Sequence, residues 1–430
     1  MTYSLQTIPA ELFLSVVDYI PSRRDLLNLA SCSHRCYDIV TPRAYRSVFF
    51  SLGSLRAISG LLRTILLNPT IAEFVLSVDV LLAQDHPGES FLVDTNMPPL
   101  FPIPHQCLER AVNVVSTSRK EKYQWLSALN SKNPDAYVAL LLSPLVNLKT
   151  LILRPWGRGS YCFKILQRAA ADDTGLGHTF PRLQDLRLYD NGSTRLISSN
   201  MLASLVLLPA LQHLEAWSLY GDEMENIDWA GLGRSNVTYI ALTGAVCVNG
   251  LGKLLPSCRN LKVFDYTHCY PGDAASFDPH RLYESLHAVK DTLEILRFRS
   301  YQRQVNNRAF IGSFAGFTAL KELEIGARFL HSLNMAVRLH TLFPVSLEKL
   351  KILSLSEDRV LWALQEIDFW LDGWLNSTPD LRKVVLGGSG FFTMSQCSMI
   401  SRYMQKWKKM THCITISGED FLCDVHTLIF

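Results

Sequence analysis

Apolar residues recur along most of this chain in the pattern L-x-x-L-x-L, in which another apolar residue can replace a leucine. Within the final L-x-L, the two apolar side chains point to one side of an extended backbone and the intervening residue points to the other, so each copy predicts a short strand. Successive copies start 24 to 35 residues apart. The nine copies start at Leu148, Leu183, Leu211, Val237, Leu261, Leu293, Leu320, Leu347 and Leu381.

The segments between these copies carry helical patterns whose apolar sides can cover one face of a sheet. The clearest are Arg281–Lys290, His331–Leu342 and Asp358–Leu375. Because no single repeat can bury its own apolar face, we expect neighbours to stack into a curved α/β solenoid with a parallel inner sheet and helices on the outside. The spacing resembles that of leucine-rich repeats, and Asn191 and Cys269 stand where that motif carries Asn or Cys.

A second pattern occupies residues 5–46, where apolar residues at helical spacing predict three short helices. Pro21 ends the first helix, either Ser22 or Asp25 can cap the second, and the third extends up to Thr41-Pro42. So small a unit has more apolar surface than it can bury internally, and part of that surface should therefore face a partner.

The stretch 5–46 resembles an F-box, with Tyr37 where many F-boxes carry Trp. The matching positions are Ile8-Pro9, Glu11-Leu12, Ile20-Pro21, Asp25-Leu26, Leu29 and Cys32-Ser33. The resemblance implies docking on a Skp-type adaptor. The residues expected to make that contact are Ile8, Pro9, Glu11, Leu12, Val16, Ile20, Leu26 and Leu29.

Between the two patterns the chain is less regular. Val75–Val80 predicts a capping strand, and Gln84–His105, which contains five prolines, predicts a surface loop. Helices are expected at Cys107–Ser118, Lys120–Asn130 and Pro134–Leu142. The sequence therefore divides into an F-box at 1–50, a linker with a capping strand and helices at 51–143, a repeat array at 144–417 and a tail at 418–430.

Composition narrows the possible partners and compartments. With 42 Lys and Arg against 39 Asp and Glu, the chain lacks the strong basic excess of a general nucleic-acid binder. We find neither a secretory signal peptide nor an apolar run long enough to span a membrane. The ten cysteines include no C-x-x-C pair. Free thiols in a reducing compartment, cytoplasmic or nuclear, are therefore expected.

Three short motifs resemble parts of metal-binding, phosphate-binding or nucleic-acid-binding and membrane-binding sites, but the residues around them do not complete such a site. Cys32–Cys36 lacks a second pair of metal ligands. Gly387–Gly390 lacks the Lys-Ser/Thr of a phosphate-binding loop, and a turn after the last repeat strand is expected there. Arg402–Lys409 is basic with interleaved aromatics, and is expected to be a solvated helix face. We therefore expect no catalytic site, no metal and no cofactor.

The residues at the x positions of the strands should line the inner face of the sheet. In the C-terminal repeats they form adjacent bands of alternating charge, and the aromatic residues Tyr189 and Trp217 lie at corresponding positions of earlier copies. Either the bands neutralise each other, or they form a surface that binds a target protein. In the second case their charges can be reversed with little harm to the fold. The residues proposed for target binding are Arg297, Arg299, Glu322, Glu324, Lys349, Lys351 and Lys383.

An F-box followed by a leucine-rich solenoid resembles the substrate receptor of an SCF ubiquitin ligase, and residues 135–151 are similar to the first repeat of fungal members. The resemblance implies that the F-box docks on the Skp adaptor, and through it on a cullin-RING ligase, while the repeats hold a target protein. Two alternatives remain. One is an F-box scaffold that acts outside ubiquitination. The other is a plain leucine-rich-repeat interaction protein, or an enzyme whose site is scattered over loops.

Overall fold

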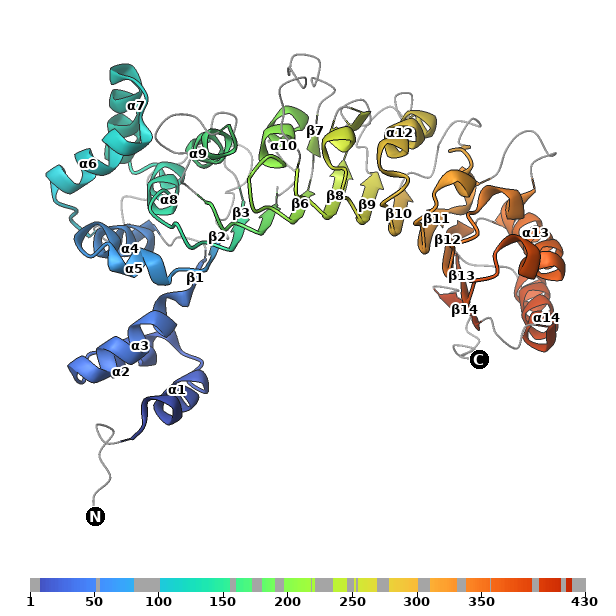
Figure 1. The fold of residues 1–430 in the computed structure, drawn as a ribbon, viewed down its shortest axis with the longest axis horizontal. Coiled ribbons are helices and arrows are strands. Elements are labelled where there is room, and N and C mark those ends of the chain that lie inside the picture. Colours follow the sequence, from blue (N-terminus) through green and yellow to red (C-terminus); the bar gives the residue numbers. More distant parts are fainter. Residues whose placement is uncertain are drawn as a thin grey trace. The chain divides into compact units, whose positions relative to one another are not determined.

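The computed structural model in Figure 1 forms two compact units. The first contains residues 1–196 and 204–212, and the second contains residues 197–203 and 213–430. The described residues are 8–51, 55–80, 101–154, 160–171, 180–189, 197–217, 219–220, 235–245, 251–252, 254–268, 278–300, 310–330, 338–355, 357–388, 394–410 and 415–419.

The first unit begins with the three predicted helices, α1 (Ala10–Asp18), α2 (Arg23–Ala30) and α3 (His34–Arg46). Ser22 caps α2 by accepting a hydrogen bond from the Asp25 backbone N–H. Their shared core contains Phe13, Val17, Leu26, Ala30, Cys36, Val40 and Ala44.

Helix α3 continues through Pro42, where the sequence predicted its end. Val40, Thr41 and Ala44 are all buried, so the buried face of the helix runs past the proline. An interior proline removes one hydrogen bond from the helix, and its ring crowds the carbonyl four residues earlier; burial of this face offsets both costs.

Four parallel strands follow in the order β1 (Ser47–Phe50), β2 (Ser77–Val80), β3 (Thr150–Leu153) and β4 (Asp185–Leu188). The three predicted helices are present as α6 (His105–Val115), α7 (Arg119–Asn130) and α8 (Pro134–Leu142). Residues 84–100 of the predicted loop lie outside the described residues. Elements without a specific sequence prediction are β1, α4 (Leu55–Leu67), α5 (Thr70–Phe74) and α9 (Tyr161–Ala170).

A buried carboxylate joins α8 to α9. Asp135 accepts hydrogen bonds from the Ser160 hydroxyl at 2.7 Å and from the backbone N–H groups of Tyr161 and Cys162 at the start of α9. Burial raises the pKa of Asp135, and these hydrogen bonds oppose that rise. The carboxylate therefore satisfies helix-terminal N–H groups that would otherwise be unpaired.

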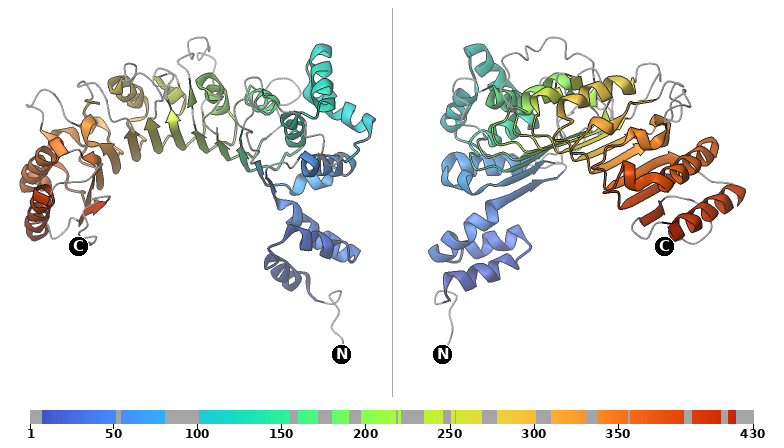
Figure 2. Two further views of the ribbon diagram at one scale, coloured as in Figure 1. Left: turned by 180° about the vertical axis from the view of Figure 1, so that it is seen from behind. Right: turned by 45° about the vertical axis from the view of Figure 1, so that its right-hand side comes forward.

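The second unit contains eight parallel strands that pair in sequence order, as Figure 2 shows. Two short strands, β5 (Ile197–Ser198) and β7 (Leu219–Tyr220), pair separately. The eight strands are β6 (His213–Trp217), β8 (Tyr239–Ala245), β9 (Val263–His268), β10 (Ile295–Ser300), β11 (Glu322–Gly326), β12 (Lys349–Leu355), β13 (Lys383–Gly388) and β14 (Thr415–Glu419).

Helices and short 3-10 turns connect the strands of the second unit, and α12, α13 and α14 lie on one side of its sheet (Figure 1). The predicted helices at 281–290 and 358–375 are present. Residues 338–342 of the third are described, and Leu339–Leu342 form a 3-10 turn. The connecting elements are α10 (Ser199–Leu205), η2 (Leu255–Ser257), α12 (Pro279–Leu286), η4 (His287–Val289), η5 (Phe314–Gly316), η6 (Ala327–Phe329), η7 (Leu339–Leu342), α13 (Glu357–Ser377) and α14 (Met394–Met410).

All nine copies of the sequence pattern form strands, which confirms the prediction. In the second unit the central apolar residue of each copy stacks on its neighbour in register, and every member of this ladder is completely buried. The ladder consists of Leu214, Ile240, Phe264, Leu296, Leu323, Leu350 and Val384. Such stacking buries apolar faces that an isolated repeat would expose.

Candidate functional site

The N-terminal helices leave a stripe of large apolar side chains exposed. Leu12, Val16 and Tyr19 lie four and three residues apart on or just after α1, with exposed fractions of 59%, 52% and 88%. Phe13 and Val17 occupy the opposite flank and are buried. Residues three and four apart share one face of a helix, so these three side chains form a continuous surface. We call Leu12, Val16 and Tyr19 the α1 stripe.

The other predicted adaptor contacts fall into three groups. Pro9 and Glu11 are exposed beside the stripe. Leu26 belongs to the core, so its side chain supports the surface and is not part of it. The remaining contacts are partly buried against that core, and they are Ile8, Ile20 and Leu29. Tyr19 is absent from the predicted contacts, although its spacing of seven residues from Leu12 places it on the same helical face.

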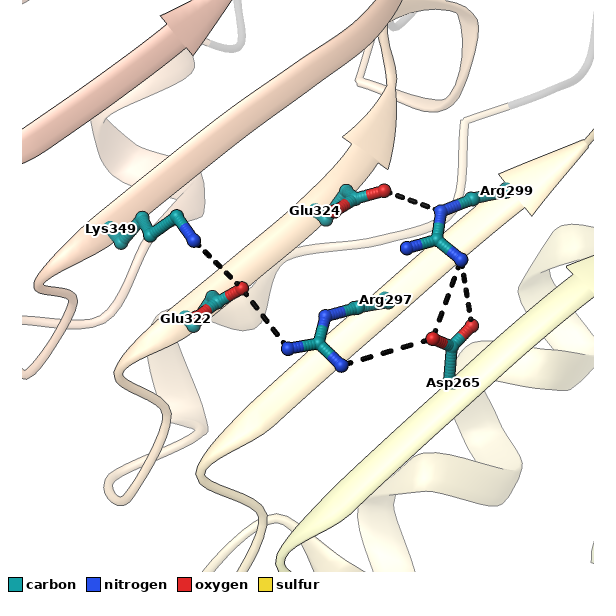
Figure 3. Close-up of polar contacts among 6 residues, drawn as sticks. All are labelled: Asp265, Arg297, Arg299, Glu322, Glu324 and Lys349. Atoms are coloured by element: carbon teal, nitrogen blue, oxygen red, sulfur yellow. Dashed lines mark hydrogen bonds and ion pairs between the residues drawn. The ribbon is translucent and has the colours of Figure 1, made fainter. Parts of the chain in front are cut away.

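The inner sheet face of the second unit carries a network of paired charges, drawn in Figure 3. It connects four neighbouring strands and contains three basic and three acidic side chains. We call this set the inner charge network. Its members are Asp265 on β9, Arg297 and Arg299 on β10, Glu322 and Glu324 on β11, and Lys349 on β12.

The two arginines bridge the acidic residues on either side of β10. Arg299 pairs with Glu324 at 2.5 Å and with Asp265 at 3.2 Å. Arg297 pairs with Glu322 at 3.4 Å and lies 3.9 Å from Asp265. Both arginines therefore lie between two carboxylates, each supplied by a neighbouring strand.

The acidic members of the network are largely shielded from water. Side-chain exposure is 7% for Glu324, 14% for Asp265 and 19% for Glu322. Burial raises the pKa of Asp265, and the nearby charges of Arg299 and Arg297 oppose that rise. The expectation that these acidic side chains stand in solvent is therefore wrong, because neighbouring side chains cover them.

The sequence of the strand array matches a known protein family. A family model described as "Leucine-rich repeat domain" matches residues 163–391, which is more than half of the chain. The chain belongs to the leucine-rich repeat family. No F-box family model matches it, and no curated protein matches the chain.

Three lysines on β12 and β13 form a basic group that shares Lys349 with the inner charge network. Lys349 lies in register with Lys383, and it also pairs with Glu322 at 3.1 Å. Lys351 lies in register with Glu324 on one side and with Val385 on the other. The structure therefore brings all seven predicted target-binding residues onto four adjacent strands, β10 to β13.

Aromatic side chains occupy the first strands of the same unit. The rings of His213 and Tyr239 stack with their centroids 4.0 Å apart. Trp217 is 42% exposed, and its indole N–H donates to Glu215 at 2.9 Å. Tyr189 is half-buried on the first unit. The leucine-rich repeats thus present an aromatic group on β6 and β8 and a charged group on β10 to β13.

Within the described residues, no group of three His, Cys, Asp or Glu side chains could hold a metal ion. Helices long and apolar enough to cross a membrane are likewise absent from the part of the chain that the structure describes. Cys36, Cys162 and Cys258 are buried free thiols. Cys397 departs from the expectation of free thiols, since it is disulfide-bonded.

Proposed function

We propose that this leucine-rich repeat protein is the substrate receptor of an SCF-type ubiquitin ligase. In this proposal the N-terminal helices dock on a Skp-type adaptor and the repeats hold a target protein. The observation that carries the proposal is the α1 stripe, because three large apolar side chains remain exposed on a unit of three short helices. Exposed apolar surface of this kind is typical of a protein interface.

The N-terminal sequence supports the same partner. Residues 5–46 match the F-box pattern at six places, and two of the matches flank the stripe, at Pro9 and Glu11. Pro9 stands at the N-cap of α1, where its missing N–H has no cost, and its carbonyl accepts from the Phe13 backbone at 3.0 Å. The motif thus fixes the start of the helix that presents the stripe.

Leucine-rich repeats generally bind other proteins through their exposed strand face. We place target binding on β10 to β13, where Lys351 and Lys383 extend the positive charge of Lys349. A receptor of this kind performs no chemistry. It raises the effective concentration of the target's lysines at the ligase.

Adaptor binding is the direct test. Leu12→Ala should weaken binding of a purified Skp-type adaptor by about 2 kcal/mol, roughly thirtyfold, because a central contact loses its side chain. Leu12→Asp/Val16→Asp should abolish binding. The matched control is Leu67→Asp/Val114→Asp, which changes two exposed apolar residues on other helices of the same unit. Equal adaptor affinity in both double variants would contradict the proposal.

Co-purification distinguishes a ligase receptor from a scaffold that uses the same adaptor. The full chain should recover cullin and RING subunits together with the adaptor, and Leu12→Asp/Val16→Asp should lose all three. Recovery of the adaptor without cullin would instead favour a scaffold outside ubiquitination.

Target capture tests the repeats separately. Proteins captured under proteasome inhibition by the full chain should be lost from Lys351→Glu/Lys383→Glu while adaptor binding remains. Arg382→Glu/Arg402→Glu is a matched charge reversal at exposed positions of the same unit. Equal capture by both variants would move the target site away from β12 and β13.

A further inference from the structure

A cleft of about 550 Å³ lies among helices α2, α3 and α4 of the first unit. This volume is within the range of small-molecule binding sites. Its apolar walls include Leu27, Leu61 and Phe101. Polar groups at its edge are supplied by Asn28, Tyr45 and Thr64.

Three arginines line the cleft, Arg23 and Arg24 from α2 and Arg63 from α4. No Asp or Glu is among its lining residues in the described part of the chain. Within the same described residues, none of the three forms an ion pair. The cleft therefore concentrates positive charge that the described residues do not neutralise.

Two of these arginines hold buried donors without an acceptor. The Nε atoms of Arg23 and Arg63 are both buried and make no hydrogen bond among the described residues. Arg23 also lies over the Tyr45 ring, with its guanidinium carbon 5.0 Å from the ring centroid. A buried donor without an acceptor has a free-energy cost, and a ligand that accepts hydrogen bonds from these donors would remove that cost.

We propose that this cleft binds a small phosphorylated molecule. Guanidinium groups bind phosphate through paired, charge-assisted hydrogen bonds, and three arginines line this cleft, whose described lining residues include no carboxylate. The apolar walls leave room for the rest of such a molecule beside the phosphate. This site is distinct from the α1 stripe, whose residues are absent from the lining of the cleft.

Gly60 fixes one wall of the proposed site. A Cβ placed on Gly60 would lie 2.9 Å from the Phe101 ring, which is closer than such contacts normally occur. The ring can therefore pack over α4 only because residue 60 has no side chain. Gly60→Ala should displace Phe101 and alter the wall without changing any charge.

Calorimetric titration of the full chain with inorganic pyrophosphate tests the site. Wild type should bind, and Arg23→Gln/Arg63→Gln should bind at least a hundredfold more weakly, about tenfold for each charged hydrogen-bond donor removed. The matched control, Arg110→Gln/Arg119→Gln, removes two exposed arginines of the same unit and should leave affinity unchanged. Inorganic phosphate in place of pyrophosphate should bind more weakly, because a single phosphate engages fewer guanidinium groups.

Arg24→Gln provides a second test if the double variant does not fold, since Arg24 is exposed at the cleft. It should weaken pyrophosphate binding about tenfold. The proposal is overturned if wild type does not bind pyrophosphate, or if the cleft variants and the control variant bind it equally well. Adaptor binding measured on the same samples reports the α1 stripe separately, so either proposal can fail alone.

Discussion

The N-terminal helices and the inner sheet face of the second unit differ in which side chains they leave exposed and in whether those side chains have partners. On α1, Leu12, Val16 and Tyr19 remain in solvent although they are apolar. On the sheet, Arg297 and Arg299 are charged, yet they lie between carboxylates and are only partly exposed. The helical surface gains free energy only when a partner covers it, whereas the inner charge network is already satisfied. Charge alternation in a sequence is therefore weaker support for a binding site than uncovered apolar surface.

The largest loss of stability is expected from a substitution in the core beneath the sheet, which neither surface includes. Leu323 stands in the buried ladder between Leu296 and Leu350. Leu323→Ala should lower the free energy of unfolding by roughly 2–5 kcal/mol, because it leaves a cavity in a packed core. Hydrogen exchange should quicken in β10 and β12 as well, since neighbouring repeats stabilise each other. If the variant unfolds like wild type, Leu323 does not belong to the core.

A smaller loss is expected from the inner charge network. Arg299→Glu would place a third negative charge beside Asp265 and Glu324 and remove their shared cation. We expect a loss of about 1–3 kcal/mol in chemical denaturation, less than for a fully buried pair because Arg299 is partly exposed. Arg382→Glu makes the same reversal at an exposed position beside β13 and should have almost no effect. Equal stability of the two variants would show that the network contributes nothing.

The pH dependence of stability should distinguish a buried network from an exposed one. Because burial raises the pKa of Asp265 above its ordinary value of 3.8, the folded state binds a proton more readily than the unfolded state there. This favourable contribution is fully present below pH 3.8 and is lost as the pH rises through the folded-state pKa. Wild type should therefore gain stability relative to Asp265→Asn as the pH falls from 7 towards 4. A difference independent of pH would contradict the burial.

The sequence predicts these regions unequally, for physical reasons. The ladder was predictable because Leu296, Leu323 and Leu350 each stand in a local pattern whose period is that of a strand. The alternating bands were predicted as well, and the structure shows the alternative in which neighbouring bands neutralise each other. Which arginine pairs with which carboxylate was not predictable, because side-chain conformation decides it: Arg297 lies in register with Glu324 but pairs with Glu322.

The arginine cleft and the first strand could not be predicted from the sequence either. Arg23 and Arg63 are forty residues apart in sequence and line one cleft only because the tertiary fold brings α2 and α4 to it. The strand β1 is only four residues long and lacks the L-x-x-L-x-L pattern, so its assignment depends on pairing with β2. Contacts that arise from tertiary packing carry no local signal in either case.

The smallest expected effect concerns the stability of the α1 stripe itself. Leu12→Asp/Val16→Asp should change the free energy of unfolding by no more than about 0.5 kcal/mol, because both side chains are exposed before and after the change. Phe13→Ala on the same helix should lose roughly 3–5 kcal/mol, since Phe13 is buried in the core. A large loss from the exposed pair would mean that the stripe contributes to the fold, and the reason for assigning it to a partner would disappear. Near-wild-type stability together with lost adaptor binding would show that these side chains serve a partner interface and not the fold.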